Sequence, residues 1–143
     1  MKVVSDSELV EKALQMLPFS YAPYSGFFVG AALLCADGSV YTGCNIENVS
    51  FGPSNCAERT AFFKAISEGK KDFISIAIVG GPKGLTEKYC PPCGVCRQVM
   101  REFCGDSFRV IMAKSKNDFK VRTLSELLPE SFYPQSEIGS SAS

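Results

Sequence analysis

The strongest constraint on the fold is the apolar stretch "FISIAIVGG", which occupies residues 73 to 81. Its residues are apolar almost without interruption, whereas a strand with one solvent-facing side would alternate apolar and polar side chains. This pattern is typical of a central strand that is covered on both faces. Because helices are the usual cover for such a strand, the stretch predicts a sheet between two helical layers.

Helical periodicity appears on both sides of this strand. Residues 6 to 17 are predicted to form a helix that Asp6 caps and Pro18 ends. Its apolar residues at helical spacing are Leu9, Val10, Ala13, Leu14 and Leu17. Three further helices are predicted, from Cys56 to about Glu68, from Cys93 to before Gly105, and over "LSELL" at residues 124 to 128.

Four more strands complete the expected order. They cover residues 27 to 35, 39 to 44, 108 to 114 and 119 to 123, and Asp37-Gly38 is a hairpin signal between the first two. The order of elements predicts an α/β fold, a three-layer α/β/α sandwich with a five-stranded mixed sheet. Residues 1 to 133 are expected to form a single domain, and the serine-rich residues 134 to 143 a mobile tail.

Charge and hydropathy argue against two classes of partner. Fifteen basic residues balance fifteen acidic ones, and the only short basic cluster is Lys70-Lys71. Without a positively charged stripe, nucleic acid is not expected as a partner. The longest apolar run, "FFVGAALLCA", is too short to span a bilayer, so no membrane partner is expected. Acidic residues interrupt any secretory segment near the N-terminus, and a cytoplasmic location with reduced, metal-bound or buried cysteines is expected.

Cysteines at two predicted helix starts indicate a metal site. Cys93 and Cys96 are neighbours in the first turn of one helix, and Cys56 opens another. The unpaired N–H groups of a first turn favour negatively charged thiolates. Three thiolates leave one position of a tetrahedral zinc ion free, which is the arrangement of a catalytic zinc. One Zn²⁺ per chain is therefore expected.

Four other cysteines need a different interpretation. Cys35, Cys44 and Cys104 lie in or beside apolar segments and are predicted to be small buried side chains. Cys90 forms C-x₂-C-x₂-C with Cys93 and Cys96, a spacing that also begins an iron–sulfur pattern. Two prolines extend the chain between Cys90 and the helix start, by about 9 Å over three residues, and Cys90 is predicted not to be a ligand. The iron–sulfur interpretation remains a minor rival.

Glu58 is the candidate for proton transfer, because the chain contains no histidine. A glutamate in a first helical turn is favoured by the helix dipole and often has no other role. Two residues after a metal-binding cysteine, however, its carboxylate can lean toward a metal-bound water and move that water's protons.

Four ordered segments carry a resemblance to a known family: "YAPYSGFFVGAAL", "GCNIENVSFG", "NCAERTAFFKAISEG" and "PCGVCRQVMREF", followed by "ELLPESF". Over roughly residues 21 to 132 the chain resembles the small homotetrameric cytidine deaminases, whose zinc is held by three cysteines. Pro91 and the loop of residues 80 to 92 depart from the usual pattern, without touching a predicted ligand.

The resemblance implies an activity and a set of site residues. The activity is hydrolytic deamination of cytidine and deoxycytidine, small pyrimidine nucleosides, in pyrimidine salvage. By resemblance, Cys56, Cys93 and Cys96 bind zinc, Glu58 is the catalytic proton carrier, Asn45 and Glu47 hold the ribose hydroxyls, Phe27 stacks on the pyrimidine, the N–H of Ala57 meets the base carbonyl, and Phe132 reaches in from a neighbouring subunit of a homotetramer. Tyr24 is expected near the same subunit boundary.

Arg59 is expected to offset an electrostatic disadvantage of a zinc site with three thiolates. Three thiolates around Zn²⁺ give a net charge of −1, which should weaken its acidifying effect on water. A guanidinium beside the thiolates can hydrogen-bond them and withdraw charge, although a solvated Arg59 on a helix face is the alternative. Three further alternatives stay open at this point: a structural zinc or iron–sulfur module, a deaminase of nucleic acid, and a deaminase of a cytosine-bearing antibiotic.

Overall fold

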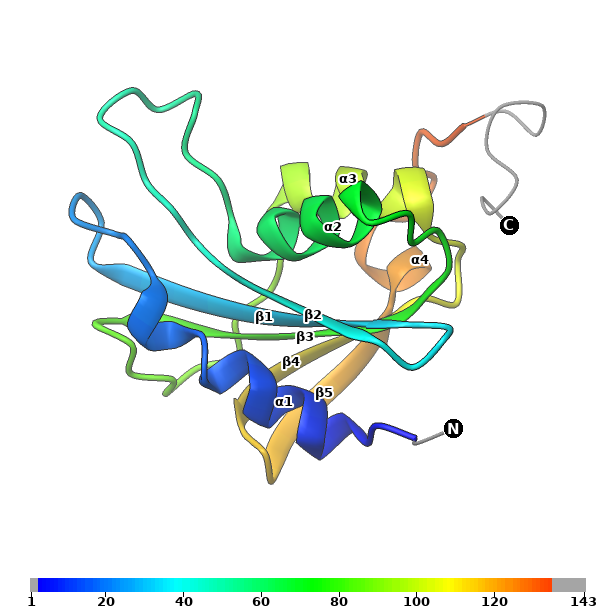
Figure 1. Ribbon diagram of the computed structural model, residues 1–143, viewed down its shortest axis with the longest axis horizontal. Helices are drawn as coiled ribbons and strands as arrows, with labels where there is room; N and C mark the ends of the chain where they lie inside the picture. Colours follow the sequence, from blue (N-terminus) through cyan, green and yellow to red (C-terminus); the bar gives the residue numbers. More distant parts are fainter. Residues whose placement is uncertain (1–2, 135–143) are drawn as a thin grey trace.

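The computed structural model describes residues 3 to 134 and shows one five-stranded sheet between helices (Figure 1). The strands are β1 (Phe27–Cys35), β2 (Val40–Cys44), β3 (Phe73–Pro82), β4 (Arg109–Ser115) and β5 (Asp118–Thr123). The helices are α1 (Asp6–Leu14), a 3₁₀ turn η1 (Leu17–Phe19), α2 (Ala57–Ser67), α3 (Gly94–Phe103) and α4 (Leu124–Leu127). The predicted three-layer α/β/α sandwich with a mixed sheet is confirmed. The expected tail from residue 135 onward lies outside the described residues.

The strand order β2-β1-β3-β4-β5 places β3 in the centre of the sheet. β1 is antiparallel to β2 and to β3, β3 is parallel to β4, and β4 is antiparallel to β5. Seven consecutive residues of β3, from Ser75 to Gly81, are buried. The prediction that the apolar stretch forms a central strand covered on both faces is therefore confirmed.

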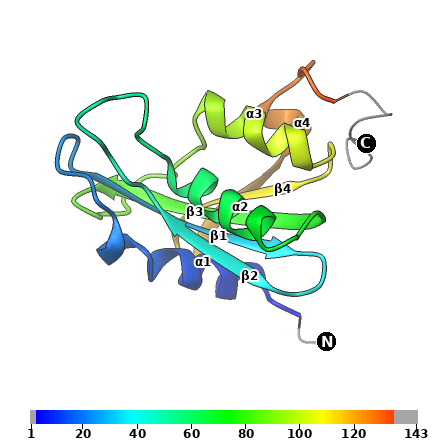
Figure 2. The same cartoon turned by 45° about the horizontal axis from the view of Figure 1, so that its top comes forward.

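Each face of the sheet has its own hydrophobic core. In Figure 2, α1 lies under one face while α2, α3 and α4 lie over the other. The α1 core joins Leu9, Val10 and Ala13 to Ala77 and Ile111 of the sheet. The opposite core is built around Phe62 of α2, whose ring is 5.1 Å from that of Phe73 and 6.0 Å from that of Phe108, centroid to centroid. None of the helices within residues 3 to 134 has the length and apolar character needed to cross a membrane.

The first helix begins at residue 6, as predicted, but its cap and its end differ from the prediction. Ser5 is the N-cap and forms a capping box with Glu8, whereas Asp6 makes an ion pair with Arg109 at 2.7 Å. The guanidinium of Arg109 lowers the pKa of Asp6. The helix ends at Leu14 rather than residue 17, and Pro18 lies inside the following 3₁₀ turn. Pro18 has no N–H to donate to the carbonyl oxygen of Leu14, and in an α-helix its ring would clash with that carbonyl, so the α-helix ends at Leu14.

A close approach of α2 to the sheet brings its first turn against β2. Gly43 of β2 faces this turn, and a Cβ atom added to Gly43 would lie 2.5 Å from the carbonyl oxygen of Ala57 and 2.7 Å from the amide nitrogen of Ala61. Real Cβ atoms do not approach backbone atoms this closely, so only glycine permits the observed packing. The position of the α2 N-terminus therefore depends on Gly43.

We expect Gly43→Ala to push α2 away from the sheet and to lower the free energy of unfolding by about 1–3 kcal/mol, the usual cost of overpacking. Urea denaturation at fixed protein concentration measures this loss. Gly52→Ala is the matched control, because a Cβ added to Gly52 meets nothing within 4 Å. Equal unfolding midpoints for the two variants would contradict the role given to Gly43.

Candidate metal centre and active site

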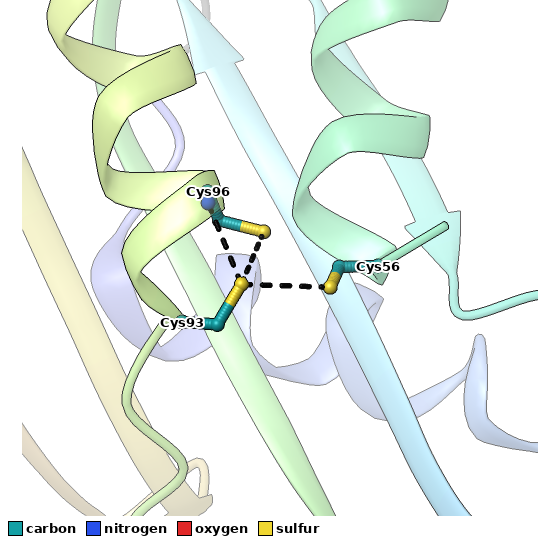
Figure 3. Close-up of side chains that lie close together, drawn as sticks. All are labelled: Cys56, Cys93 and Cys96. Carbon is teal, nitrogen blue, oxygen red and sulfur yellow. Dashed lines mark hydrogen bonds between the residues drawn. The ribbon is translucent and has the colours of Figure 1, made fainter. Parts of the chain in front are cut away.

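Three cysteine sulfurs meet between the starts of α2 and α3 (Figure 3). The Sγ atoms of Cys56 and Cys93 are 3.7 Å apart, and those of Cys93 and Cys96 are 3.4 Å apart. All three lie within 4.8 Å of one another, and they form the group of metal-ligating side chains found within the described residues. Residues separated by 37 positions in the sequence are thus brought to one point.

Helix starts supply two of these sulfurs. Cys56 is the N-cap of α2, and Cys93 is the N-cap of α3, where its Sγ accepts a hydrogen bond from the backbone N–H of Cys96 at 3.4 Å. Cys96 follows in the first turn of α3 and is buried. The N–H groups of both first turns carry partial positive charge, which favours thiolates at this place.

Arg59 contacts the cluster from the first turn of α2. Its Nη2 donates a hydrogen bond to the Sγ of Cys56 at 3.4 Å. Hydrogen bonds from the Cys96 thiol and from Arg59 lower the pKa of Cys56 to about 5. The pKa of Cys96 is raised, because its hydrogen bond to Cys56 and its burial both favour the thiol. Burial opposes the charge of Arg59, but its bonds to the two sulfurs outweigh burial and raise the pKa of the guanidinium.

Glu58 is a buried carboxyl beside the three sulfurs. Its side chain comes from the first turn of α2, and the residue is only 4% exposed. Burial is the main cause that raises the pKa of Glu58 to about 7, and the nearby Cys56 adds to the effect. A carboxyl with a pKa near neutrality can both accept and donate a proton, as an acid-base group requires.

The donor set fits a zinc ion. Zinc bonds thiolate sulfur at about 2.3 Å, so two sulfurs on a tetrahedral ion are about 3.8 Å apart. The observed Sγ separations of 3.7 and 3.4 Å are close to this value. Three sulfur ligands leave the fourth position for water or substrate.

Cys90 is not part of the sulfur cluster within the described residues. Burial raises the pKa of Cys90 to about 12. Its Sγ lies against Gly80 of β3, where an added Cβ would be 3.1 Å from it. Cys35, Cys44 and Cys104 are buried free cysteines, as predicted.

The two residues expected to hold the ribose make backbone hydrogen bonds in this chain. Asn45 donates through Nδ2 to the carbonyl oxygen of Phe27 at 2.8 Å and accepts at Oδ1 from the N–H of Val29 at 2.9 Å. Glu47 accepts from the N–H groups of Tyr24 and Ser25 at 3.0 and 3.1 Å and from the Ser25 hydroxyl. These bonds lower the pKa of Glu47, and the bond from the Ser25 hydroxyl has the largest effect. Asn45 therefore fixes the start of β1, and Glu47 fixes the segment that leads into it.

The remaining predicted residues lie at three different places. Phe27 begins β1 and is 39% exposed, so its ring is accessible. Ala57 is the fully buried first residue of α2, where an N–H group has no acceptor within the helix. Phe132 follows α4, and its side chain is 84% exposed while its carbonyl oxygen accepts a hydrogen bond from Gln98 at 2.7 Å.

Sequence reasoning missed two groups of residues around the site. Ser25 binds Glu47, and the only local signal was the turn sequence "YSGF". Gln98 and Arg101 of α3 contact the segment around Phe132, and nothing local in the sequence pairs positions 30 or more residues apart.

Comparison with known proteins decides the family. A family model described as the cytidine and deoxycytidylate deaminase zinc-binding region matches residues 3 to 113. This chain belongs to that family. The matched family region is zinc-binding and the three sulfurs fit zinc, so zinc is the metal of this site.

Several known proteins are similar to this chain over most of its length. A cytidine deaminase of Halalkalibacterium halodurans is 51% identical over 87% of this chain and 91% of its own length, and one of Sporosarcina psychrophila is 46% identical over 87% and 89%. The crystal structure of cytidine deaminase from Burkholderia pseudomallei has a TM-score of 0.82 at 43% identity and covers 90% of this chain and 99% of its own. That from Mycobacterium tuberculosis has a TM-score of 0.78 at 38% identity, with 91% and 98% covered.

The sulfur geometry predicts different zinc contents for two cysteine variants. Cys96→Ser removes a sulfur from the cluster, and we expect it to lose most of its zinc. Cys90→Ser is the matched control and should keep one zinc per chain. Mass-spectrometric metal analysis of the purified proteins measures both. Comparable losses from the two variants would show that the ligand assignment is wrong.

Proposed function

We propose that this protein is a zinc-dependent deaminase that hydrolyses cytidine and deoxycytidine to uridine and deoxyuridine with release of ammonia. The observation that carries the proposal is a buried carboxyl, Glu58, beside a three-sulfur site that leaves one zinc position free. Relatives that carry the name cytidine deaminase, among them one of 51% identity, support the choice of substrate.

Zinc bound by Cys56, Cys93 and Cys96 supplies a Lewis acid that lowers the pKa of water and so provides a nucleophile at neutral pH. Glu58 is the proposed proton carrier. Its carboxylate accepts a proton from the attacking water and delivers it to N3 of the pyrimidine, which makes C4 more electrophilic. Once the C4–O bond has formed, the carboxylate takes the second proton from that oxygen and passes it to the C4 amino group. The C4–N bond then breaks, ammonia leaves with the bonding pair, and a carbonyl remains at C4.

Charge at the site is balanced by this chain's own groups. Arg59 donates to the Cys56 sulfur and therefore withdraws negative charge from it. The N–H groups at the starts of α2 and α3 act in the same direction. We propose that these donors restore the acidifying power that three thiolates would otherwise remove from the metal.

The nucleoside is proposed to lie beside the segment that leads into β1. Phe27 would stack on the pyrimidine, the N–H of Ala57 would meet the base carbonyl, and Asn45 and Glu47 would hold the ribose hydroxyls. The backbone bonds of Asn45 and Glu47 support this role, because they hold both side chains in one orientation before substrate arrives. Each side chain keeps further hydrogen-bonding capacity, since a carboxylate offers about four lone-pair sites and an amide two donors.

A homotetramer with shared pockets is the proposed working form. In support, several large apolar side chains are exposed on the single chain, among them Tyr24, Phe51 and Phe132. Aromatic side chains are enriched at protein–protein interfaces, which supports a partner surface on this chain. Phe132 is proposed to enter a neighbouring subunit's pocket, with Tyr24 near the same boundary.

The protein is also proposed to lie in the cytoplasm, to act in pyrimidine salvage and to form one domain. All seven cysteines are free, which supports a reducing compartment and hence the cytoplasm. Conversion of free nucleosides to uridine and deoxyuridine fits pyrimidine salvage. Residues 1 to 133 are proposed to act as one domain.

Glu58→Gln tests the reaction directly. The amide cannot carry the proton, so turnover of cytidine should fall at least ~100-fold. The zinc content and the thermal midpoint should stay unchanged, because Glu58 lies outside the sulfur cluster. Loss of absorbance at the cytosine band measures turnover for the parent and the variant. A parent that leaves cytidine unchanged would refute the proposed activity, and near-normal turnover in the variant would refute the role of Glu58.

Shared pockets predict complementation between two inactive subunits. Glu58→Gln and Phe132→Ala chains should each have low activity alone. Mixed oligomers should regain activity, because some pockets then combine an intact Glu58 with a neighbour's intact Phe132. Light scattering measures the number of chains in the oligomer and should give four. A fully active monomer, or mixtures no more active than their parents, would contradict the shared pocket.

A further inference from the structure

Two side chains of α3 hold three consecutive residues near the end of the described chain. Gln98 Nε2 donates to the carbonyl oxygen of Phe132 at 2.7 Å, and Arg101 Nε donates to the hydroxyl of Ser131 at 2.6 Å. The guanidinium carbon of Arg101 lies 5.4 Å from the centre of the Tyr133 ring. Gln98 and Arg101 are three positions apart and therefore share one face of the helix. We call these two residues the clasp.

Arg101 is itself held firmly. It is 3% exposed, it forms an ion pair with Asp106, and its Nη1 donates to the carbonyl oxygen of Cys104 at 3.4 Å. A buried guanidinium is costly unless its donors are satisfied, so these partners restrict it to one orientation. The Ser131 hydroxyl and the Tyr133 ring consequently meet a fixed surface.

The clasp binds the backbone of Phe132 and the side chains on either side of it, and leaves the Phe132 ring free. That ring is 84% exposed although Ser131 and the Phe132 carbonyl are hydrogen-bonded and the Tyr133 ring contacts the Arg101 guanidinium. α3 also bears the zinc ligands Cys93 and Cys96 at its start. One helix therefore carries two metal ligands at its start and holds the Phe132 segment with its middle and last turns.

We infer that Gln98 and Arg101 are positioning residues that hold the Phe132 ring in the orientation in which it enters a neighbouring subunit's substrate pocket. The inference rests on the shared pocket of the proposed function. An exposed aromatic ring on an unrestrained segment would lose conformational freedom each time a pocket closes on substrate. With the clasp in place, that ordering has already occurred during folding, so substrate binding is stronger.

Gln98→Ala is the first test, because Gln98 is exposed and its loss creates no cavity. We expect the KM for cytidine to rise about fivefold, the effect of freeing roughly one side chain, with kcat within about twofold of the parent. Glu102→Ala is the matched control: Glu102 is exposed on the same helix and makes no hydrogen bond or ion pair within residues 3 to 134. Its KM should equal that of the parent.

A double-mutant cycle separates positioning from a merely structural role. In a Phe132→Ala background, Gln98→Ala should have no further effect on KM, because the ring that it positions is gone. Arg101→Lys should also raise the KM in the parent and have no further effect on it in the Phe132→Ala background. Lysine keeps the positive charge but loses the planar set of donors. If Arg101→Lys does not fold, Ser131→Ala removes the same hydrogen bond. An unchanged KM in Gln98→Ala, or an equal rise with and without Phe132, would overturn the inference.

The absence of tryptophan from the sequence allows a direct measure of the segment's motion. Phe132→Trp introduces a single tryptophan, which can be excited at wavelengths where tyrosine does not absorb. Gln98→Ala in that protein should increase the fast component of its time-resolved anisotropy, while Glu102→Ala should not. Full activity of Phe132→Ala would overturn the shared pocket and this inference with it. Loss of activity in Phe132→Ala together with an immobile fluorophore in the Gln98→Ala protein would overturn the positioning role alone.

Discussion

The site depends on two helices that begin at the same place on one face of the sheet. Three thiolates within 4.8 Å of one another repel each other, and the repulsion is offset by the N–H groups of both first turns, by Arg59 and by the metal that they bind. The helix starts must therefore be placed accurately. Gly43 allows α2 to contact β2 closely. In the strand order β2-β1-β3-β4-β5, β3 is central, and the segment that follows β3 leads into α3, which lies beside α2.

Around this metal centre, polar side chains serve to orient neighbouring segments. Asn45 binds backbone groups of Phe27 and Val29 at the start of β1, and Glu47 binds those of the segment before it. The clasp of Gln98 and Arg101 does the same for the segment around Phe132. In both cases hydrogen bonds to the backbone fix a segment and leave an aromatic ring exposed, an arrangement suited to contacts with a ligand or a second chain.

Comparison of particular elements shows where prediction from sequence succeeded. The central strand β3 followed from its continuous apolar run, and the caps Cys56 and Cys93 lie within one residue of the predicted helix starts. For the first helix, the predicted start at residue 6 is confirmed, whereas the predicted cap and the predicted end are wrong. Ser5 and Asp6 are both good capping residues, but Glu8 stands three positions after Ser5 and completes a capping box, a local signal that the prediction did not use. The ion pair of Asp6 with Arg109, 103 residues away, has no such local signal.

The sequence by itself determined the class of fold, the cysteines able to bind zinc and the carboxyl beside them. These features depend on local patterns: apolar periodicity, helix starts, and the spacing of Cys93 and Cys96 on one turn. Only the tertiary structure decided that Cys56 lies 3.7 Å from Cys93, that burial raises the pKa of Glu58 to about 7, and that Arg101 contacts Ser131. Each of these depends on elements that are distant in sequence and adjacent in space, because packing and burial belong to the assembled fold rather than to any one segment.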